Sequence, residues 1–171
     1  DTASADLFLA QQSGVLVQAT SNIVDAQSQF TNKTIWRDML KTMPTEFLRN
    51  KAALRFITSN DSEIDYRDSL SDRATPGSDA FLMEDRPSMY QGTPVIGIPV
   101  FPENLGIGLN LTQALLTDPK NIYVGFWREI RIETDKDISA GSVIIVATVR
   151  FGVKFAHEPA VVKAINIKVK Q

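Results

Sequence analysis

The chain has 171 residues, of which 43% are hydrophobic, so it is long enough to fold around a core of its own. It has no cysteine and one histidine, His157, which excludes disulfides, Cys/His zinc sites and catalysis by a thiolate or a histidine pair. With 18 basic and 20 acidic residues its net charge is −2, which argues against a dedicated nucleic-acid-binding protein.

The N-terminal segment predicts little regular structure. We expect one or two short helical turns within residues 3–21, on either side of Gly14. No basic segment precedes an apolar stretch here, and no apolar run in the chain reaches the roughly 18 residues that cross a bilayer. Because the chain begins with Asp1 instead of Met, we expect it to be a fragment of a longer protein.

An amphipathic helix follows. Its apolar residues recur at spacings of three, four and one, which places them on one face of a helix: Ile35, Trp36, Met39, Leu40, Met43, Phe47 and Leu48. Asn32 or Thr34 can cap its N-terminus. Pro44 has no amide hydrogen to donate, so the helix should kink there or restart with Pro44 in a new first turn.

A short strand and a second helix come next. Residues 54–58 are apolar enough for a mostly buried strand. The polar residues 59–63 then supply a helix cap and an acidic first turn, with Glu63 placed for a capping box. The helix should run from about Asp61 to Leu70.

Residues 72–92 are rich in Pro, Gly, Ser, Asp and Arg and form a segment too long for a simple turn. Loops of this length usually carry function or move. Residues 94–101 then predict an apolar strand. Because Pro99 cannot donate to a ladder, the strand should lie at an edge or contain a bulge.

From residue 122 onward the pattern is that of β-strands. Residues 122–132 place their apolar side chains mostly on one parity, as in a long strand with one buried face. The acidic residues 133–137 should then turn the chain. Residues 143–155 alternate throughout, and their second face changes from apolar to polar, so we expect this strand to be buried on both faces at first and on one face later.

A last strand is expected over residues 161–169, after a turn at residues 157–159. Its apolar residues Ile165, Ile167 and Val169 should share one side of the strand.

Two acidic groups could be considered as metal sites. The first comprises Asp61, Glu63, Asp65, Asp68 and Asp72. Helix capping and surface pairing explain these residues better, since Glu63 lies four residues before Arg67 and the segment lacks the glycine and spacing of a calcium loop. The second, residues 133–137, is better explained as a solvated turn. We therefore predict no metal site and no cofactor.

The remaining candidates are also weak. No nucleophile motif accompanies His157, which favours a turn or interface histidine. Residues 106–108 lack the third glycine of a dinucleotide loop, so we assign them no phosphate role. Arg150 and Lys154, on the polar face of their strand, could contact DNA, but ion pairing with nearby carboxylates is the more common role.

The residues alone thus indicate an α+β module with a compact lobe followed by long strands, and they assign no activity. The order of segments resembles the major capsid, or phage coat, protein family of tailed bacteriophages, from about Gly14 to Val169. The pieces that carry the resemblance are TIWRDMLKTMPTEFLRNKAALRFITS, DSEIDYRDSL, a Pro-rich loop, QGTPVIGIPVFP, QALLTDPKNIYVGFWREIRIETDKD and RFGVKFAHEPAVVKAINI.

The resemblance implies the C-terminal half of a capsid subunit, with an axial lobe of helices around a small sheet and a peripheral lobe of long strands beside a spine helix. Residues 1–30 would lead in from the spine region, residues 31–120 would form the axial lobe and residues 121–171 the peripheral strands. The N-terminal arm, the extended loop and most of the spine helix of the family would be missing.

Some members of the family join subunits by an isopeptide bond between a loop lysine and a late asparagine, assisted by a glutamate. In this chain the asparagine position falls near Ser142 and the glutamate position near Val149. The resemblance therefore implies a shell without this crosslink, held by non-covalent contacts and a possible cementing protein.

The function implied is that of a structural, non-enzymatic subunit of a prophage icosahedral capsid, which forms pentamers and hexamers around double-stranded DNA. Its partners would be copies of itself, scaffold, portal or cementing proteins, and packaged DNA by weak non-specific contact, with no membrane. It would reside in the virion capsid, and in the host cytoplasm before assembly. An encapsulin-like bacterial shell is the alternative, and an α+β hydrolase a distant third.

The loop over residues 72–92 is our expected subunit contact, because it carries apolar residues among charged ones. The residues proposed for this interface are Phe81, Leu82, Met83, Arg86, Met89 and Tyr90.

Overall fold

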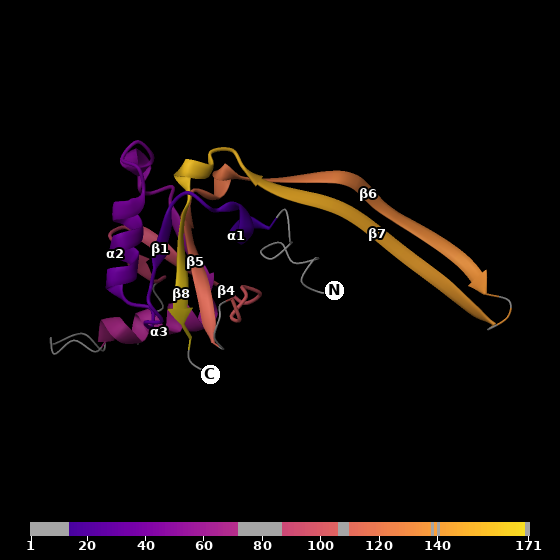
Figure 1. Cartoon of the computed structure of the whole chain (residues 1–171), viewed down its shortest axis with the longest axis horizontal. Coiled ribbons are helices and arrows are strands. Elements are labelled where there is room, and N and C mark those ends of the chain that lie inside the picture. Colours follow the sequence, from indigo (N-terminus) through magenta and orange to yellow (C-terminus); the bar gives the residue numbers. More distant parts are fainter. Residues whose placement is uncertain (1–13, 72–86, 106–109, 138, 140, 170–171) are drawn as a thin grey trace.

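The computed structural model describes residues 14–71, 87–105, 110–137, 139 and 141–169. Its body is a six-stranded sheet, and a separate two-stranded hairpin of β6 and β7 extends away from the body (Figure 1). The strands are β1 (Ile23–Asp25), β2 (Arg55–Ser59), β3 (Met89–Tyr90), β4 (Thr93–Ile98), β5 (Leu111–Thr117), β6 (Ile122–Asp137), β7 (Ser142–Phe155) and β8 (Val162–Lys168).

The helices are α1 (Val15–Gln18), α2 (Lys33–Thr42) and α3 (Asn60–Ser71), with 3₁₀ turns at Phe47–Asn50, Pro119–Asn121 and Glu158–Ala160. The fold is therefore α+β, as expected from the sequence. None of the helices in the described part of the chain is long and apolar enough to cross a membrane.

The sheet has the strand order β1-β8-β5-β2-β4-β3. β1 pairs with β8 and β2 with β4 in parallel, and the other neighbours are antiparallel. The sheet thus takes strands from all three of the expected segments, and β8 lies between β1 and β5. The division into an axial and a peripheral lobe stays a prediction. Of the strands after residue 121, β8 belongs to the six-stranded sheet, and only β6 and β7 form a separate hairpin.

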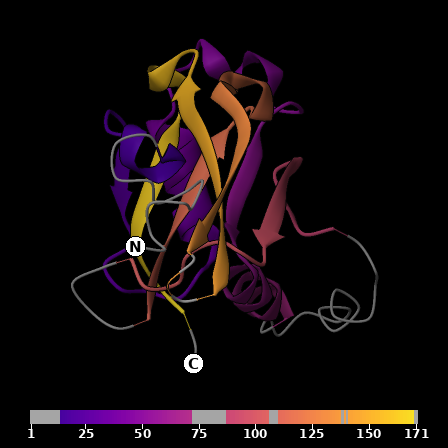
Figure 2. The ribbon, with the colours of Figure 1, turned by 90° about the vertical axis from the view of Figure 1, so that its right-hand side faces the viewer.

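The two faces of the sheet carry two separate apolar clusters, because neighbouring residues of a strand point to opposite faces. On β2 and β5, Phe56 and Leu116 face α2 and α3, whereas Ile57 and Leu115 face the other cluster, which includes α1 and the base of the hairpin. Figure 2 views the molecule from the free end of the hairpin, with the sheet behind it.

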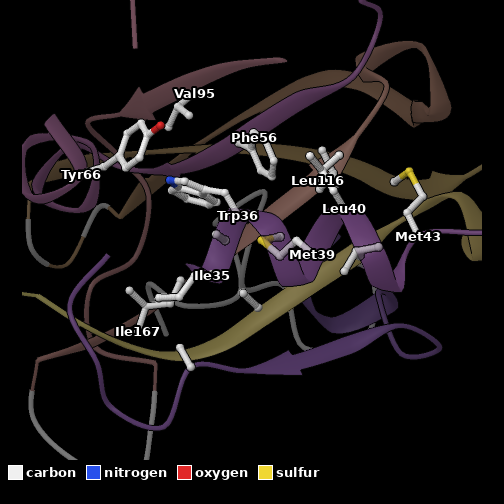
Figure 3. Close-up of a cluster of buried hydrophobic side chains, with 14 of the residues drawn as sticks. Ile35, Trp36, Met39, Leu40, Met43, Phe56, Tyr66, Val95, Leu116 and Ile167 are labelled. Carbon is white, nitrogen blue, oxygen red and sulfur yellow. The ribbon is translucent and has the colours of Figure 1, made fainter. Parts of the chain in front are cut away.

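Trp36 of α2 is the centre of the larger cluster (Figure 3). Its ring lies 4.8 Å from that of Phe56 and 5.8 Å from that of Tyr66, the latter edge to face. Tyr66 also donates a hydrogen bond of 3.1 Å from its hydroxyl to the backbone carbonyl of Met89. The contacts of these three aromatic residues thereby join α2, α3, β2 and β3.

α2 confirms the predicted amphipathic helix and its cap. The Asn32 side chain accepts hydrogen bonds from the backbone N–H groups of Thr34 and Ile35, at 2.8 and 3.2 Å. The helix ends at Thr42, and the chain turns at Pro44 into a 3₁₀ turn at Phe47–Asn50, so regular structure resumes after the proline in 3₁₀ form.

α3 confirms the second predicted helix and packs closely on β4. A Cβ added at Gly97 would lie 2.7 Å from Oδ1 and 3.1 Å from Cα of Asn60, so any larger residue there would require α3 or β4 to shift. Glu63 departs from the predicted capping box: its carboxylate accepts a hydrogen bond from the Ser88 hydroxyl and lies 3.9 Å from the Arg67 guanidinium.

β8 changes its buried parity along its length. Val162 and Ala164 belong to the larger cluster and so does Ile167, three residues further on. Asn166, at a φ of 57°, lies where the ladder with β5 shifts register. Because this irregularity adds one residue, Ile165 leaves the side that Ile167 occupies, and their predicted shared face is wrong.

Several predicted boundaries are corrected by the structure. Residues 133–137 continue β6 and do not turn the chain; the turn follows Asp137. Pro99 lies directly after β4 and not within the ladder. β1 and β5 were not predicted, although β5 is a central strand.

Candidate subunit interface

The hairpin has no other sheet to lie on within the described chain. β6 and β7 pair from Ile122 opposite Phe155 at the base to Asp137 opposite Ser142 at the outer end. At about 3.3 Å per residue, the 14 residues of β7 span roughly 46 Å. A two-stranded ribbon is only marginally stable in water by itself, so its surfaces need a partner.

Large apolar side chains are exposed along both strands of the hairpin. Trp127 is 89% and Phe126 73% exposed. The full set comprises Tyr123, Val124, Phe126, Trp127, Ile130, Ile132, Val143, Ile144, Ile145, Val146 and Val149. Exposed apolar surface this extensive marks an interface. The predicted buried faces are therefore wrong for most of the hairpin as described, because alternation shows which residues share a face but not what covers it. At the inner end of β7, Val153 and Phe155 are buried on one face, as expected.

More of the exposed apolar residues lie on one face of the hairpin than on the other, which also carries Tyr123, Ile144 and Val146. β6 gains an extra residue between Phe126 and Arg128 and another between Arg128 and Arg131, whereas β7 stays regular. On the more apolar face Val124 lies opposite Val153 and Phe126 opposite Phe151, whose rings are 6.5 Å apart. Further out the same face carries Ile132, Ala147, Ile145 and Val143. We call this the apolar face.

The polar face of the hairpin has a different character. Near the base Tyr123 lies opposite Lys154, and Gly125 opposite Gly152. Arg150 follows on the same face of β7. Toward the outer end Glu133 and Asp135 lie opposite Val146 and Ile144, and Glu133 pairs with Arg131 at 2.7 Å.

The base of the hairpin is fixed to the body by packing and by one asparagine. Val153 and Phe155 are buried in the smaller cluster with Leu115 and Val161. Asn121, itself buried, accepts a hydrogen bond of 2.8 Å from the backbone N–H of His157 and donates one of 2.9 Å to the carbonyl of the same residue. The two strands therefore leave the body from a closed junction.

The segment before β1 is attached to the same junction through Glu158. The Glu158 carboxylate accepts hydrogen bonds from the backbone N–H groups of Thr20 and Ser21, each at 2.8 Å, and from the Ser21 hydroxyl. Partial burial alone would raise the pKa of Glu158, but the donors from Ser21 and Thr20 outweigh it and hold that pKa below its ordinary value.

Further contacts secure this segment on both sides. Gln18 donates from its side-chain amide to the carbonyl of Val153 at 2.7 Å, so the segment also touches the hairpin. Lys163 donates to the carbonyl of Leu16 at 2.9 Å. Burial lowers the pKa of Lys163 below its ordinary value, and the charge of Glu158 opposes that shift.

The residues predicted for the interface lie mostly outside the described part of the chain. This applies to Phe81, Leu82, Met83 and Arg86. Of the other two, Met89 is 48% exposed in β3, whereas Tyr90 packs partly buried against the core, with its ring 6.4 Å from that of Phe56. A contact role for this loop stays a prediction.

The other residues considered from the sequence lie beside a turn, on the exposed hairpin or outside the described part of the chain. His157 is exposed beside the turn at Glu158–Ala160, with its ring 6.5 Å from that of Phe47. Arg150 and Lys154 are exposed on β7. Residues 106–108 lie outside the described part of the chain. Among the described residues, no three His, Cys, Asp or Glu side chains come together as a metal site.

Comparison with known proteins gives one relative in sequence. The chain is 38% identical to the prophage capsid protein YqbE of Bacillus subtilis (strain 168) over 172 aligned residues, which cover 98% of the chain and 55% of YqbE. The chain thus spans about half the length of this relative. No protein-family model matches the sequence.

Solved structures with the same fold are shell proteins. The SrpI encapsulin of Synechococcus elongatus PCC 7942 has a TM-score of 0.65 at 13% identity, over 96% of this chain and 60% of its own. The Mycobacterium phage Che8 structure has a TM-score of 0.61 at 16% identity, over 86% and 54%. The capsid of a native GTA particle has a TM-score of 0.65 at 12% identity, over 97% and 61%.

These identities are too low to show more than the fold, and the relation to YqbE adds the link in sequence. The resemblance to the phage major capsid protein family is confirmed: the chain has the fold of phage capsid and encapsulin subunits and is related in sequence to a prophage capsid protein.

Proposed function

We propose that the chain is part of the shell subunit of a prophage capsid, and that the complete subunit assembles into five- and six-membered rings around double-stranded DNA. The observation that carries the proposal is the long hairpin with its exposed apolar face, in a chain related to a prophage capsid protein. Such a surface is costly in an isolated subunit and is stable once other chain segments cover it. The role is structural, and no catalytic residue is assigned.

The apolar face is covered, in this proposal, by a part of the same polypeptide that lies outside the chain. A little under half of YqbE falls outside the match, which leaves enough polypeptide for a helix along the hairpin. The spine helix implied by the resemblance to the capsid family is the candidate. Neighbouring subunits would then meet the opposite, polar face and the edges of the hairpin.

An encapsulin-like shell that carries a protein cargo is the second candidate, favoured by the fold shared with the SrpI encapsulin. The sequence relation favours the prophage capsid, since identity to YqbE is 38% and identity to the encapsulin 13%. Nucleic acid protected inside purified particles would support the capsid, and a single co-purified enzyme would support the alternative.

The test is expression of the full-length protein without other viral genes, followed by negative-stain electron microscopy. We expect hollow polyhedral particles. Phe126→Asp and Ile145→Asp place a charge on the apolar face and should abolish them, whereas Ile64→Asp, at an exposed apolar residue of α3, should not. A wild-type protein that remains monomeric at high concentration would contradict the proposal.

The same substitutions in the chain alone serve as the folding control. Phe126 and Ile145 are largely exposed there, so their replacement should change the unfolding midpoint of the chain little. A large loss of stability in the chain itself would show that these side chains support its fold and not an interface.

A further inference from the structure

Two glycines lie opposite each other on the polar face of the hairpin. Gly125 of β6 pairs with Gly152 of β7, and a Cβ added to either would meet no atom within 4 Å. Neither glycine is among those with a positive φ, so neither backbone requires glycine. Glycine in the middle of a strand weakens it and commonly marks a place where another group approaches the backbone closely. We call this bare patch the glycine notch.

The side chains around the glycine notch are basic and aromatic. Tyr123 and Lys154 lie on its base side, and Arg150 lies on its outer side, two residues along β7. All three side chains are exposed. Among the described residues, neither Arg150 nor Lys154 takes part in a salt bridge. The notch therefore consists of backbone without side chains between two cationic residues. This arrangement suits the carboxylate side chain of another chain segment.

The outer end of the same face carries the opposite charge. Glu133 and Asp135 lie on it, opposite Val146 and Ile144, and both are exposed. Glu133 already pairs with Arg131, whereas the Asp135 carboxylate accepts a local hydrogen bond of 2.8 Å from the backbone N–H of Lys136. One face of one hairpin thus presents both a basic notch and an acidic end.

The separation of these two features permits a reciprocal contact. Along β7, Gly152 and Ile144, which faces Asp135, are eight residues apart, or roughly 26 Å at about 3.3 Å per residue. If two hairpins lie antiparallel with their polar faces together, each acidic end reaches the notch of the other. Such a contact is symmetric about a twofold axis, the commonest symmetry of protein pairs.

We propose that the glycine notch receives the acidic outer end of the hairpin of a second copy, with Asp135 of that copy between Lys154 and Arg150. This inference rests on the proposed function, in which neighbouring subunits contact the polar face of the hairpin. It names a second copy of the hairpin as the partner of that face. The charge complementarity within one face favours a second copy over nucleic acid, since phosphates would be attracted by the notch but repelled by the acidic end.

The glycines provide the sharpest test. Gly152→Val fills the notch with a side chain for which the isolated hairpin has room, and valine favours strands. The unfolding midpoint of the chain should therefore stay unchanged or rise. Self-association of the full-length protein by sedimentation velocity, and its particle yield by electron microscopy, should fall by at least about tenfold. Ile64→Val, at an exposed residue of α3 outside the hairpin, is the control and should change neither.

A charge exchange tests the partner. Lys154→Glu should weaken self-association to a similar extent, and adding Asp135→Lys in the same chain should restore part of it, because the lysine of one copy then meets the glutamate of the other while Arg150 stays beside it. Normal self-association of Gly152→Val, or no recovery in the double variant, would overturn the proposal. So would variants that assemble normally but retain less nucleic acid, since the notch would then bind phosphate.

The failure of this inference can be told from the failure of the proposed function. If the wild-type protein forms no particles but associates through the notch, the shell is contradicted and the docking surface stands. If particles form and Gly152→Val leaves them unchanged, the shell stands and the docking surface is contradicted. If the wild-type protein neither associates nor forms particles, both are contradicted.

Discussion

Asn121 and His157 exchange two hydrogen bonds across the base of the hairpin, and both bonds use the backbone of His157. A third bond of 2.9 Å runs from the N–H of Ala156 to the carbonyl of Asn121. The Asn121 side chain therefore replaces the hydrogen bonds of a neighbouring strand where the β6–β7 ladder ends. It fixes the point at which the hairpin leaves the body.

Asn121→Ala should destabilise the chain by about 1–3 kcal/mol, because two partly buried backbone groups of His157 lose their partners. Urea unfolding measures the loss, and hydrogen exchange should show faster opening of β6 and β7 near their base. His157→Ala is the control: both hydrogen bonds remain, so its effect should be small. Equal effects of the two substitutions would contradict this role of Asn121.

Trp36→Ala should cost about 3–5 kcal/mol, since it removes the ring that contacts both Phe56 and Tyr66 and leaves a cavity. Trp36→Phe should cost much less, because phenylalanine fills part of the space and removes an indole N–H that has no acceptor among the described residues. Urea unfolding curves of both variants check the order. A larger loss for phenylalanine than for alanine would contradict the packing described.

Gly97→Ala should destabilise the chain by about 1–3 kcal/mol, because the new Cβ would overlap Oδ1 and approach Cα of Asn60. Gly125→Ala adds the same methyl group where no atom lies within 4 Å, so it serves as the control. Thermal unfolding should separate the two. Similar midpoints would indicate that α3 and β4 can move apart at no cost.

Glu158→Gln should lower stability at neutral pH, because the carboxylate accepts several hydrogen bonds from Thr20 and Ser21. The pKa of Glu158 is lowered in the folded chain, so this stabilisation is fully present above the ordinary glutamate pKa of about 4.3 and is lost as pH falls through the lowered value. The stability difference between wild type and variant should therefore shrink below about pH 4. Urea unfolding over a pH series measures it. A constant difference down to pH 2 would contradict the role of the charge.

Elements whose periodicity and caps agree were predictable from sequence. The stripe from Ile35 to Met43 and the Asn32 cap define α2, and the alternation from Val143 to Phe155 defines β7. Both signals are local, because the side chains of one element decide them. The resemblance to capsid proteins followed from the order of such elements.

Elements that depend on distant partners were not predictable in the same way. β5 is polar at Thr112 and Gln113, and it becomes a central strand because β8 and β2 flank it. The acidic residues Glu133 and Asp135 suggested a turn, yet they continue β6 because β7 pairs with them. Burial of the hairpin faces depends on what covers them, which alternation cannot reveal.

The glycine notch was not predicted from sequence, although the sequence contains both Gly125 and Gly152. They become one feature only through the register of β6 and β7, which the two irregularities in β6 alter further out. The inner hairpin keeps the register that places Ile122 opposite Phe155, and no local sequence pattern fixes that pairing.

Cryo-electron microscopy of the full-length protein, purified without other viral proteins, tests the central claim most directly. We predict closed polyhedral shells in which the apolar face of the hairpin is covered by protein and the body sheet keeps the strand order β1-β8-β5-β2-β4-β3. A stable full-length protein that forms no shell, or a shell in which Phe126 and Ile145 remain in contact with solvent, would contradict it.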